Sequence, residues 1–210
     1  MAPPPLNGQE AAASARAVQS NDMAHASGQE PMQRHIWYVT GPAGCGKTTV
    51  AEYLAAALSI PYVEGDSHHT PANVEKMRTG IPLTDTDRWE WLIGLRNESM
   101  RRISDGADGV VVTCSALKRK YRDVLRVASY WNSNVVTHFI FLNAPAEMLL
   151  QRVSRRQGHY MGPAMVQSQF DILERPAEDE YDVISIDVSR SISEVQADAL
   201  TRVSDMMRRD

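Results

Sequence analysis

The sequence predicts an α/β domain whose core is a parallel sheet of about five strands flanked by helices. Short apolar runs of strand length alternate along the chain with longer runs that read as helices. A glycine-rich turn separates the first apolar run from the first helical run. Because parallel strands need a crossover connection, usually a helix, this alternation favours a parallel sheet that is covered on both faces.

Each predicted strand is a short apolar run, as expected of a strand that is buried on both sides. The runs are HIWYVT at 35–40, IPYVE at 60–64, GVVVTCSAL at 109–117, VVTHFIFLN at 135–143 and YDVISIDV at 181–188. The predicted helices are KTTVAEYLAAAL at 47–58, PANVEKMRTG at 71–80, DTDRWEWLIGLRNESMRRI at 85–103, KRKYRDVLRVAS at 118–129, PAEMLLQRVSRR at 145–156, PAMVQSQFDILERP at 163–176 and SISEVQADALTRVSDMM at 191–207.

Length and composition limit the classes of protein to consider. A chain of 210 residues with 23% charged residues suits one globular domain with a sizeable core. The formal net charge of −4 does not suggest a nucleic-acid partner, and no apolar run reaches membrane-spanning length. Cys45 and Cys114 cannot form a disulfide framework, so we expect a reducing, cytoplasmic setting.

The first 33 residues differ in composition from the rest. They are rich in Ala, Ser, Pro, Gln and Gly and almost lack large apolar side chains, so we expect a disordered tail before a folded domain at 34–210. A mitochondrial presequence is the alternative. Such segments are rich in arginine and poor in acids. This one has Arg16 alone against Glu10, Asp22 and Glu30, which favours the tail.

The turn GPAGCGKTT matches the phosphate-binding pattern G-x-x-x-x-G-K-[ST] and lies between a predicted strand and a predicted helix. Its backbone N–H groups and the helix N-terminus can bind phosphates. Lys47 can bridge the β- and γ-phosphates, and Thr48 can ligate Mg²⁺. The alternative is a chance glycine turn. The pattern predicts ATP or GTP with Mg²⁺, bound by Gly41, Pro42, Ala43, Gly44, Cys45, Gly46, Lys47, Thr48 and Thr49.

Two further patterns decide between classes of nucleotide-binding protein. The chain has no Asn-Lys-x-Asp motif, which a GTPase would use to read guanine. The third predicted strand ends in Cys114 and Ser115, whereas the corresponding strand of a motor or switch ATPase usually ends in acids. A small chain with one phosphate-binding turn and neither motif indicates a kinase for a small molecule.

The stretch GDSHHT follows the second predicted strand. Ligands of open parallel sheets bind beyond the carboxyl ends of the strands, so Asp66 is a candidate to orient an acceptor hydroxyl and accept its proton. A helix cap is the alternative for this acid. Zinc needs three or four ligands, and the adjacent side chains of His68 and His69 diverge, so a metal site is disfavoured. A hydrogen bond from His69 to a polyol hydroxyl is the better interpretation, and His68 reads as a solvated loop residue.

Several blocks together resemble the gluconokinase family. The largest is GDSHHTPANVEKMRTGIPLTDTDRWEWL, and three others are CSALKRKYRDVLR, RVSRRQGHYM and SQFDILERP. The resemblance runs from about residue 35 to 190, and its one small departure is Thr70, where a proline is frequent. In the first block the matching residues are Asp66, His69, Asn73, Lys76, Met77, Gly80, Pro82, Leu83, Asp85, Asp87, Arg88, Trp91 and Leu92.

The resemblance implies a fold and a reaction. The fold is that of P-loop kinases of the nucleoside-monophosphate and shikimate kinase group, with a lid at about 155–163. The reaction is ATP-dependent phosphorylation of D-gluconate to 6-phospho-D-gluconate, which feeds the pentose phosphate pathway, and the family makes a homodimer a possibility. A shikimate or nucleotide kinase of the same fold is one alternative, and a non-enzymatic nucleotide-binding regulator is another.

The resemblance also implies roles for charged residues. Arg152 and Arg156, at the start of the lid, can reach the transferring phosphate. His159 lies in the same block and is expected in the acceptor site. The candidates for the gluconate carboxylate are Arg88, Lys118 and Arg122.

Overall fold

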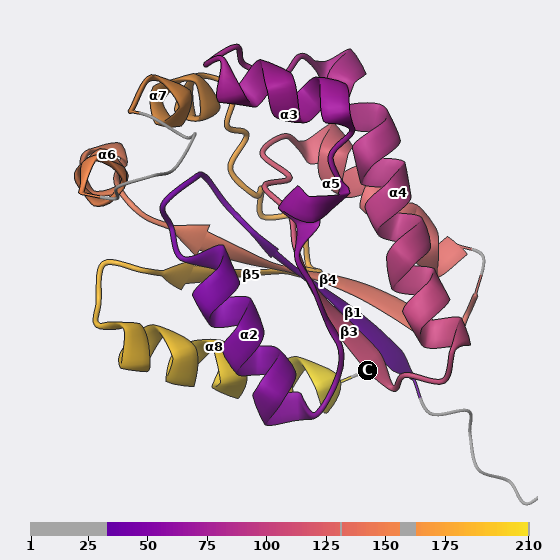
Figure 1. The fold of residues 1–210 in the computed structure, drawn as a ribbon. Coiled ribbons are helices and arrows are strands. Elements are labelled where there is room, and N and C mark those ends of the chain that lie inside the picture. Colours follow the sequence, from indigo (N-terminus) through magenta and orange to yellow (C-terminus); the bar gives the residue numbers. More distant parts are fainter. Residues whose placement is uncertain (1–32, 131, 156–162, 210) are drawn as a thin grey trace, which may run out of the picture. The chain divides into compact units, whose positions relative to one another are not determined.

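A computed structural model describes residues 33–130, 132–155 and 163–209 (Figure 1). The expected tail at 1–33 thus lies outside the described residues except for Gln33, and the expected lid at 155–163 lies outside them except at its two ends. The described part contains five strands, which are β1 (Arg34–Thr40), β2 (Tyr62–Val63), β3 (Gly109–Thr113), β4 (Val135–Asn143) and β5 (Val183–Asp187).

The sheet confirms the predicted fold class. All four strand pairings are parallel, and the strand order is β2-β3-β1-β4-β5. β1 lies in the middle of the sheet, with Ile36 opposite Val110 of β3 and Thr137 of β4. Its side chains from Ile36 to Val39 are 0% exposed, as expected where helices cover both faces of a parallel sheet.

Helices cover both faces of the sheet, and most of them begin and end within a few residues of the predicted bounds. They are α2 (Lys47–Leu58), α3 (Pro71–Arg78), α4 (Asp85–Ser104), α5 (Arg119–Arg126), α6 (Ala146–Ser154), α7 (Pro163–Asp171) and α8 (Ile192–Met207). Among the described residues, none of these helices combines the length and the hydropathy needed to cross a membrane.

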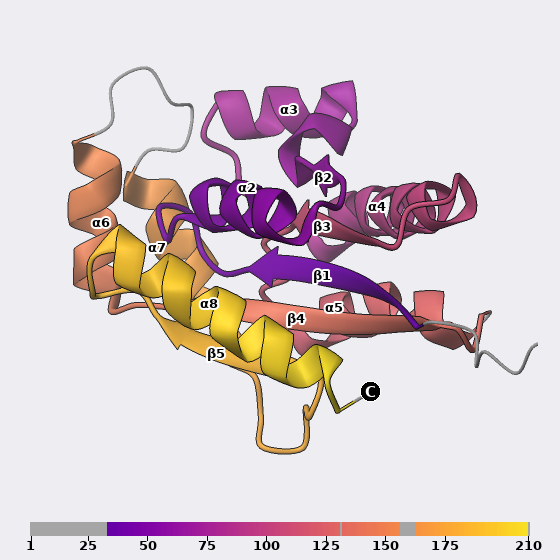
Figure 2. The same ribbon diagram turned by 90° about the horizontal axis from the view of Figure 1, so that it is seen from below.

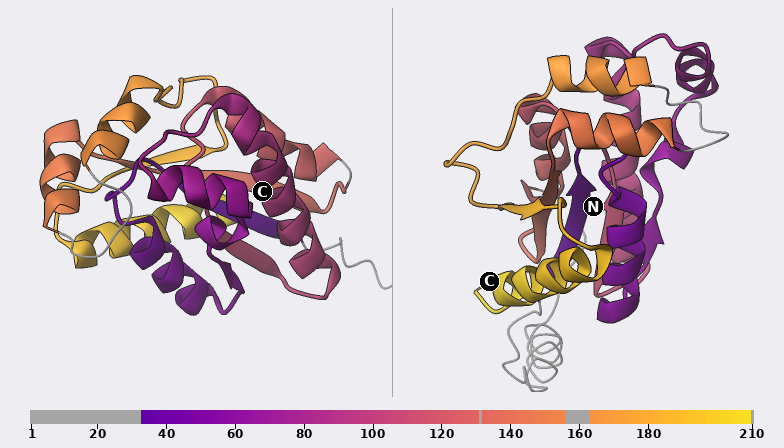
Figure 3. Two further views of the ribbon diagram at one scale, coloured as in Figure 1. Left: turned by 45° about the horizontal axis from the view of Figure 1, so that its top comes forward. Right: turned by 90° about the vertical axis from the view of Figure 1, so that its left-hand side faces the viewer.

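Successive side chains of β1 point to opposite faces of the sheet and enter two separate cores. Trp37 and Val39 pack in the core that α2 and α8 cover. Ile36 and Tyr38 pack in the core that α4 and α5 cover. Figure 2 shows α8 running along the β4–β5 part of the sheet, and Figure 3 shows α6 and α7 side by side near one end of it.

Several predicted elements are shorter in the structure, and the shortening of β2, β3 and α7 affects segments at the ends of the strands. β3 ends at Thr113 because the chain then turns through Ala116, at φ 39°, and the Ser115 carbonyl accepts a hydrogen bond from the Gly41 N–H. α7 ends at Asp171, after which the Leu173 N–H donates to the Phe170 carbonyl and the Glu174 N–H donates to the Leu117 carbonyl. β2 stops at Val63, just before a 3₁₀ turn at Gly65–His68.

Candidate active site

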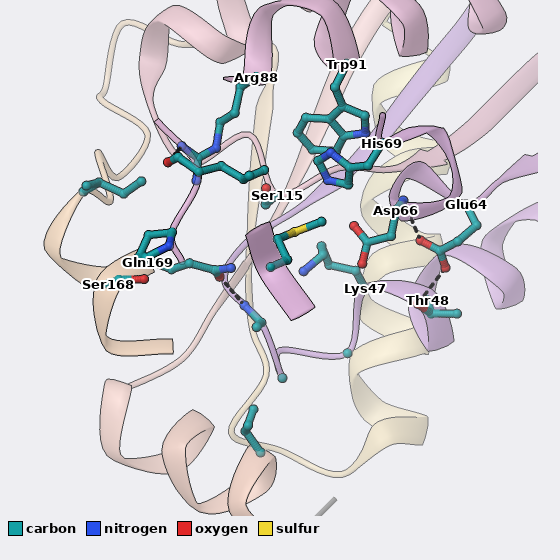
Figure 4. A pocket seen from close by; sticks show the side chains of 18 of the residues that line it. Lys47, Thr48, Glu64, Asp66, His69, Arg88, Trp91, Ser115, Ser168 and Gln169 are labelled. Atoms are coloured by element: carbon teal, nitrogen blue, oxygen red, sulfur yellow. Dashed lines mark hydrogen bonds between the residues drawn. The ribbon is translucent and has the colours of Figure 1, made fainter. Parts of the chain in front are cut away.

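A cavity of about 560 Å³ opens at the carboxyl ends of β1, β2 and β3 (Figure 4). One side of it is the phosphate loop, residues 41–46, together with the start of α2. The opposite side is the acceptor wall, which we define as Asp66, His69, Arg88 and Trp91. α7 and the residue after it close a third side, with Ser168, Gln169, Asp171 and Ile172 in the lining.

The phosphate loop has the backbone that its glycines allow. Gly41, Gly44 and Gly46 have φ values of 134°, 84° and 96°, in the region that favours glycine. A Cβ on Gly44 would lie 2.8 Å from a methyl carbon of Val153 on α6, so the loop and this helix pack closely. Among the described residues, no side chain caps the first turn of α2, and its N–H groups therefore remain available to an anion.

Lys47 extends back over the phosphate loop. Its Nζ donates to the carbonyls of Gly41 and Pro42 at 3.1 and 3.2 Å. The predicted nucleotide residues that line the cavity are Ala43, Gly44, Gly46, Lys47, Thr48 and Thr49. Cys45 instead points into the core, where burial raises the pKa of its thiol.

Glu64 is a site residue that our sequence interpretation missed. It lies directly after β2 and lines the cavity, and its carboxylate accepts hydrogen bonds from the hydroxyls of Thr48, Tyr62 and Thr113. Burial alone would raise the pKa of Glu64, but these hydrogen bonds outweigh it and leave the pKa below its ordinary value. Glu64 is therefore an anion beside Thr48. The strand-end rule that selected Asp66 would have selected Glu64 as well.

The oxygens of Thr48 and Glu64 fit a magnesium ion. Mg²⁺ keeps several waters and binds through one or two carboxylates together with substrate phosphates. The Thr48 hydroxyl lies 3.0 Å from a Glu64 carboxylate oxygen at the edge of the phosphate loop. Within the described ranges, no group of three or more His, Cys, Asp and Glu side chains could hold a metal, so phosphates and water would have to supply the remaining ligands.

The structure fixes the backbone before Asp66 on the end of β3. The Gly65 N–H donates to the Thr113 hydroxyl at 2.9 Å, and the Gly65 carbonyl accepts from the Trp91 indole at 2.8 Å. A Cβ on Gly65 would lie 1.8 Å from the Thr113 carbonyl oxygen, so only glycine fits. The carboxylate of Asp66 itself is exposed in the cavity and points toward Lys47 (Figure 4).

His69 lies flat against Trp91, with ring centroids 4.1 Å apart. Among the described residues, its buried Nδ1 has no hydrogen-bond partner. Burial lowers the pKa of His69 to about 4, Asp66 opposes this shift and Arg88 adds to it. The ring is thus a neutral, rigidly held hydrogen-bonding group on the acceptor wall. His68 is exposed, as predicted for a loop residue.

Arg88 is the predicted carboxylate-binding residue that the structure places in the cavity lining. It is 7% exposed, and its guanidinium donates to the carbonyls of Leu83 and Thr84. The guanidinium carbon lies 5.5 Å from the ring centroid of Tyr121. The partners in these contacts, two carbonyls and a tyrosine ring, are all neutral. They position Arg88 but do not neutralise its positive charge.

The other two predicted candidates for the carboxylate, Lys118 and Arg122, lie outside the lining of the cavity that the described residues form. The Nζ of Lys118 is 2.8 Å from Asp85. Arg122 is 1% exposed and makes a bidentate ion pair with Glu180 at 2.6 and 2.7 Å. The cavity formed by the described residues is lined by neither cation. Both are already neutralised by acids that are distant in sequence.

The residues expected to reach the transferring phosphate from the lid are only partly described. Arg152, on α6, donates from Nη2 to the Val188 carbonyl at 2.8 Å, and its neighbour Val153 lines the cavity. Arg156 and His159 fall in the stretch that the structure leaves undescribed.

Gln169 is a second residue that our sequence interpretation missed. It lies on α7, is 7% exposed, and its Oε1 accepts a hydrogen bond from the Ala43 N–H at 2.7 Å. A glutamine in a predicted helix carries no signal of this role, because the contact joins residues 126 positions apart.

Comparison with known proteins gives one consistent match. A family model described as AAA domain matches residues 36–176. A probable gluconokinase of Schizosaccharomyces pombe is 43% identical over 175 residues, covering 83% of this chain and 90% of that protein. A sugar kinase from Janibacter superposes with a TM-score of 0.73 at 38% identity, covering 82% of this chain and 95% of that one. A gluconokinase from Sinorhizobium meliloti superposes with a TM-score of 0.71 at 36% identity, covering 86% and 97%.

Proposed function

The chain belongs to the gluconokinase family, and we propose that its cavity transfers the terminal phosphoryl group of ATP to a hydroxyl of D-gluconate, giving 6-phospho-D-gluconate. The observation that carries this proposal is the shared cavity. A phosphate loop, an exposed carboxylate at Asp66 and the cation of Arg88 all face it. These are the groups needed to hold a nucleotide, to orient a hydroxyl and to bind a carboxylate.

On the nucleotide side, the phosphate loop and Lys47 bind the phosphates of ATP. Lys47 exchanges its loop carbonyls for β- and γ-phosphate oxygens. Thr48 and Glu64 would hold Mg²⁺ with the phosphates, and the ion supplies neutralisation of charge on the transferring group. Arg152 and Arg156 remain proposed partners of the transferring phosphate.

On the acceptor side, Asp66 orients the attacking hydroxyl and accepts its proton. His69 donates to or accepts from a second hydroxyl, and His159 remains a proposed contact from the lid. Arg88 binds the carboxylate, for which its planar pair of donors is suited. Arg122 leaves this set because its guanidinium already binds Glu180. Lys118 could reach the substrate only by giving up Asp85.

Cellular setting and assembly belong to the same proposal. Cys45 and Cys114 are free and buried, which supports a reducing, cytoplasmic location. We propose a place in the pentose phosphate pathway, a small-molecule substrate without a nucleic-acid partner, and a possible homodimer.

The experiment that tests the function compares acceptors. We expect efficient ADP release with gluconate and almost none with glucose or sorbitol, because a buried cation left without its carboxylate costs several kcal/mol, or orders of magnitude in kcat/KM. Shikimate has a carboxylate but a rigid ring, and should be a poor acceptor. Equal kcat/KM for glucose or shikimate and for gluconate would refute the assignment.

A further inference from the structure

Gln169 joins the third side of the cavity to the phosphate loop. Its Oε1 accepts the Ala43 N–H at 2.7 Å, and the side chain is 7% exposed while it still lines the cavity. We propose that Gln169 contacts the transferring phosphoryl group directly, with Oε1 holding the loop and Nε2 donating to an oxygen of the γ-phosphate. The inference rests on the proposed kinase function and adds a residue to its machinery.

The orientation of the carboxamide follows from its partner. A backbone N–H can only donate, so the atom that meets Ala43 must be the carbonyl oxygen, and the NH₂ group is the other end of the amide. Among the described residues, no hydrogen bond from Nε2 is present. Figure 4 shows Gln169 extending toward the cavity, with the dashed line marking its bond to the loop.

Lys47 indicates which phosphate lies beside this amide. Its Nζ contacts the carbonyls of Gly41 and Pro42, and the peptide N–H that Gln169 binds belongs to the next residue, Ala43. Lys47 and Gln169 therefore contact the same short stretch of the phosphate loop. Because the lysine of such a loop meets the β- and γ-phosphates, the second donor at this stretch falls at the terminal end of the triphosphate.

The chemistry of the amide suits this position. Charge in phosphoryl transfer is spread over the equatorial oxygens of the moving group, and fixed N–H donors stabilise it without having to reorganise. Gln169 is fixed by burial and by the Ala43 N–H, and it brings no extra cation to a loop that already has Lys47.

The test measures binding of two nucleotides to the full chain in the presence of Mg²⁺. ADP lacks the γ-phosphate, and AMP-PNP, an ATP analogue that resists hydrolysis, has it. Gln169→Met removes both the donor and the acceptor for the Ala43 N–H at similar volume. Gln169→Glu keeps an acceptor for Ala43 but replaces the donor with a negative charge. Gln167→Met is the matched control, because Gln167 is exposed on the same helix and this variant adds no charge beside its partner Asp171.

We expect both Gln169 variants to lose about 10- to 100-fold in affinity for AMP-PNP relative to ADP, which is the loss of a hydrogen bond to a charged group. Loss of the Ala43 contact in Gln169→Met affects both nucleotides, so it cancels in this ratio. The control should bind both nucleotides like the wild type. Melting temperatures check that each variant is folded. Equal weakening of ADP and AMP-PNP in Gln169→Met, or no weakening of either, overturns the proposal.

The same measurements separate this inference from the proposed function. If the wild type fails to phosphorylate gluconate but the variants lose AMP-PNP selectively, the acceptor assignment fails and the role of Gln169 stands. If gluconate is phosphorylated and Gln169→Met keeps the wild-type ratio of the AMP-PNP and ADP affinities, the acceptor assignment stands and the role of Gln169 fails.

Discussion

The phosphate loop is contiguous in the chain at residues 41–46, whereas the acceptor wall is assembled from Asp66, His69, Arg88 and Trp91 on two separate segments. The loop binds through backbone N–H groups, whose positions follow from glycine conformations and the start of a helix. The wall binds through side chains, and contacts with neighbouring residues position His69, Arg88 and Trp91. This difference means that the two sides should respond to substitution in different ways.

Only a few contacts position the side chains of the acceptor wall. Trp91 stacks on His69 and also donates to the Gly65 carbonyl, so one indole positions both the histidine and the backbone before Asp66. Arg88 depends on the carbonyls of Leu83 and Thr84. The loop, by contrast, is supported on two sides, by Val153 packing on Gly44 and by Gln169 on Ala43.

The largest expected effect is that of Asp66→Asn, which should lower kcat without changing nucleotide affinity. Asp66→Asn keeps the size of the side chain but removes its charge and its ability to accept a proton. We expect kcat with gluconate to fall by about 10²- to 10⁴-fold, the usual contribution of general-base catalysis. The affinity for ADP should stay near that of the wild type, because the phosphate loop is unchanged. A kcat within a few-fold of the wild type would exclude Asp66 as the hydroxyl-orienting group.

The next prediction contrasts an arginine of the wall with one of the core. Arg88→Met should lower kcat/KM for gluconate by about 10²-fold or more, because the substrate carboxylate loses its charged partner. Arg122→Met should leave kcat/KM of the folded enzyme unchanged. It should instead destabilise the fold, toward the lower end of about 3–5 kcal/mol, because the buried Glu180 loses one ion pair and keeps Arg126 and the Ala177 N–H as partners.

Thermal unfolding and kinetics on the same samples check this pair. The assay is run well below both melting temperatures, so that loss of fold and loss of activity are distinguished. A fall in kcat/KM that is larger for Arg122→Met than for Arg88→Met would return Arg122 to the acceptor site and show that its ion pair opens in solution.

The phosphate loop, Asp66 and Arg122 show which parts of the site a sequence reveals and which it does not. Of the nine predicted nucleotide residues, six line the cavity, since a phosphate loop depends on one contiguous pattern and on the elements beside it. Asp66 was found because parallel strands present their carboxyl ends at one edge of the sheet. Arg122 could not be assigned in this way, because its partner Glu180 lies 58 positions further along the chain, and the sequence does not reveal that pairing.

The same limit explains the residues that were missed. Glu64 is the last residue of a predicted strand, so the rule that selected Asp66 could have found it. Gln169 could not have been found, because its role depends on how α7 packs beside the phosphate loop. The five-stranded order was likewise not predicted beyond its parallel character. Alternation specifies that the strands are parallel, whereas their order depends on which helix covers which face.

The smallest expected effect concerns pH and the histidine of the wall. The ordinary pKa of histidine, 6.5, is lowered to about 4 in His69, chiefly because burial disfavours the imidazolium. The unfolded chain therefore binds a proton near pH 6.5, and the folded chain does so only near pH 4. Between these values the unfolded state binds more protons, so acidification should lower the free energy of unfolding, and this contribution is fully present only above about pH 6.5.

His69→Gln should consequently show a shallower loss of stability than the wild type as the pH falls from about 6.5 to 4, with His68→Gln as the control for removing a neighbouring histidine. Chemical denaturation at a series of pH values measures the difference. NMR of the His69 ring should give a midpoint near pH 4, and a midpoint near 6.5 would contradict it. Because His69 stays neutral above that range, it can bind a sugar hydroxyl without competing with Arg88 for the carboxylate. The kcat/KM for gluconate should then show no step from this residue between about pH 6 and 8.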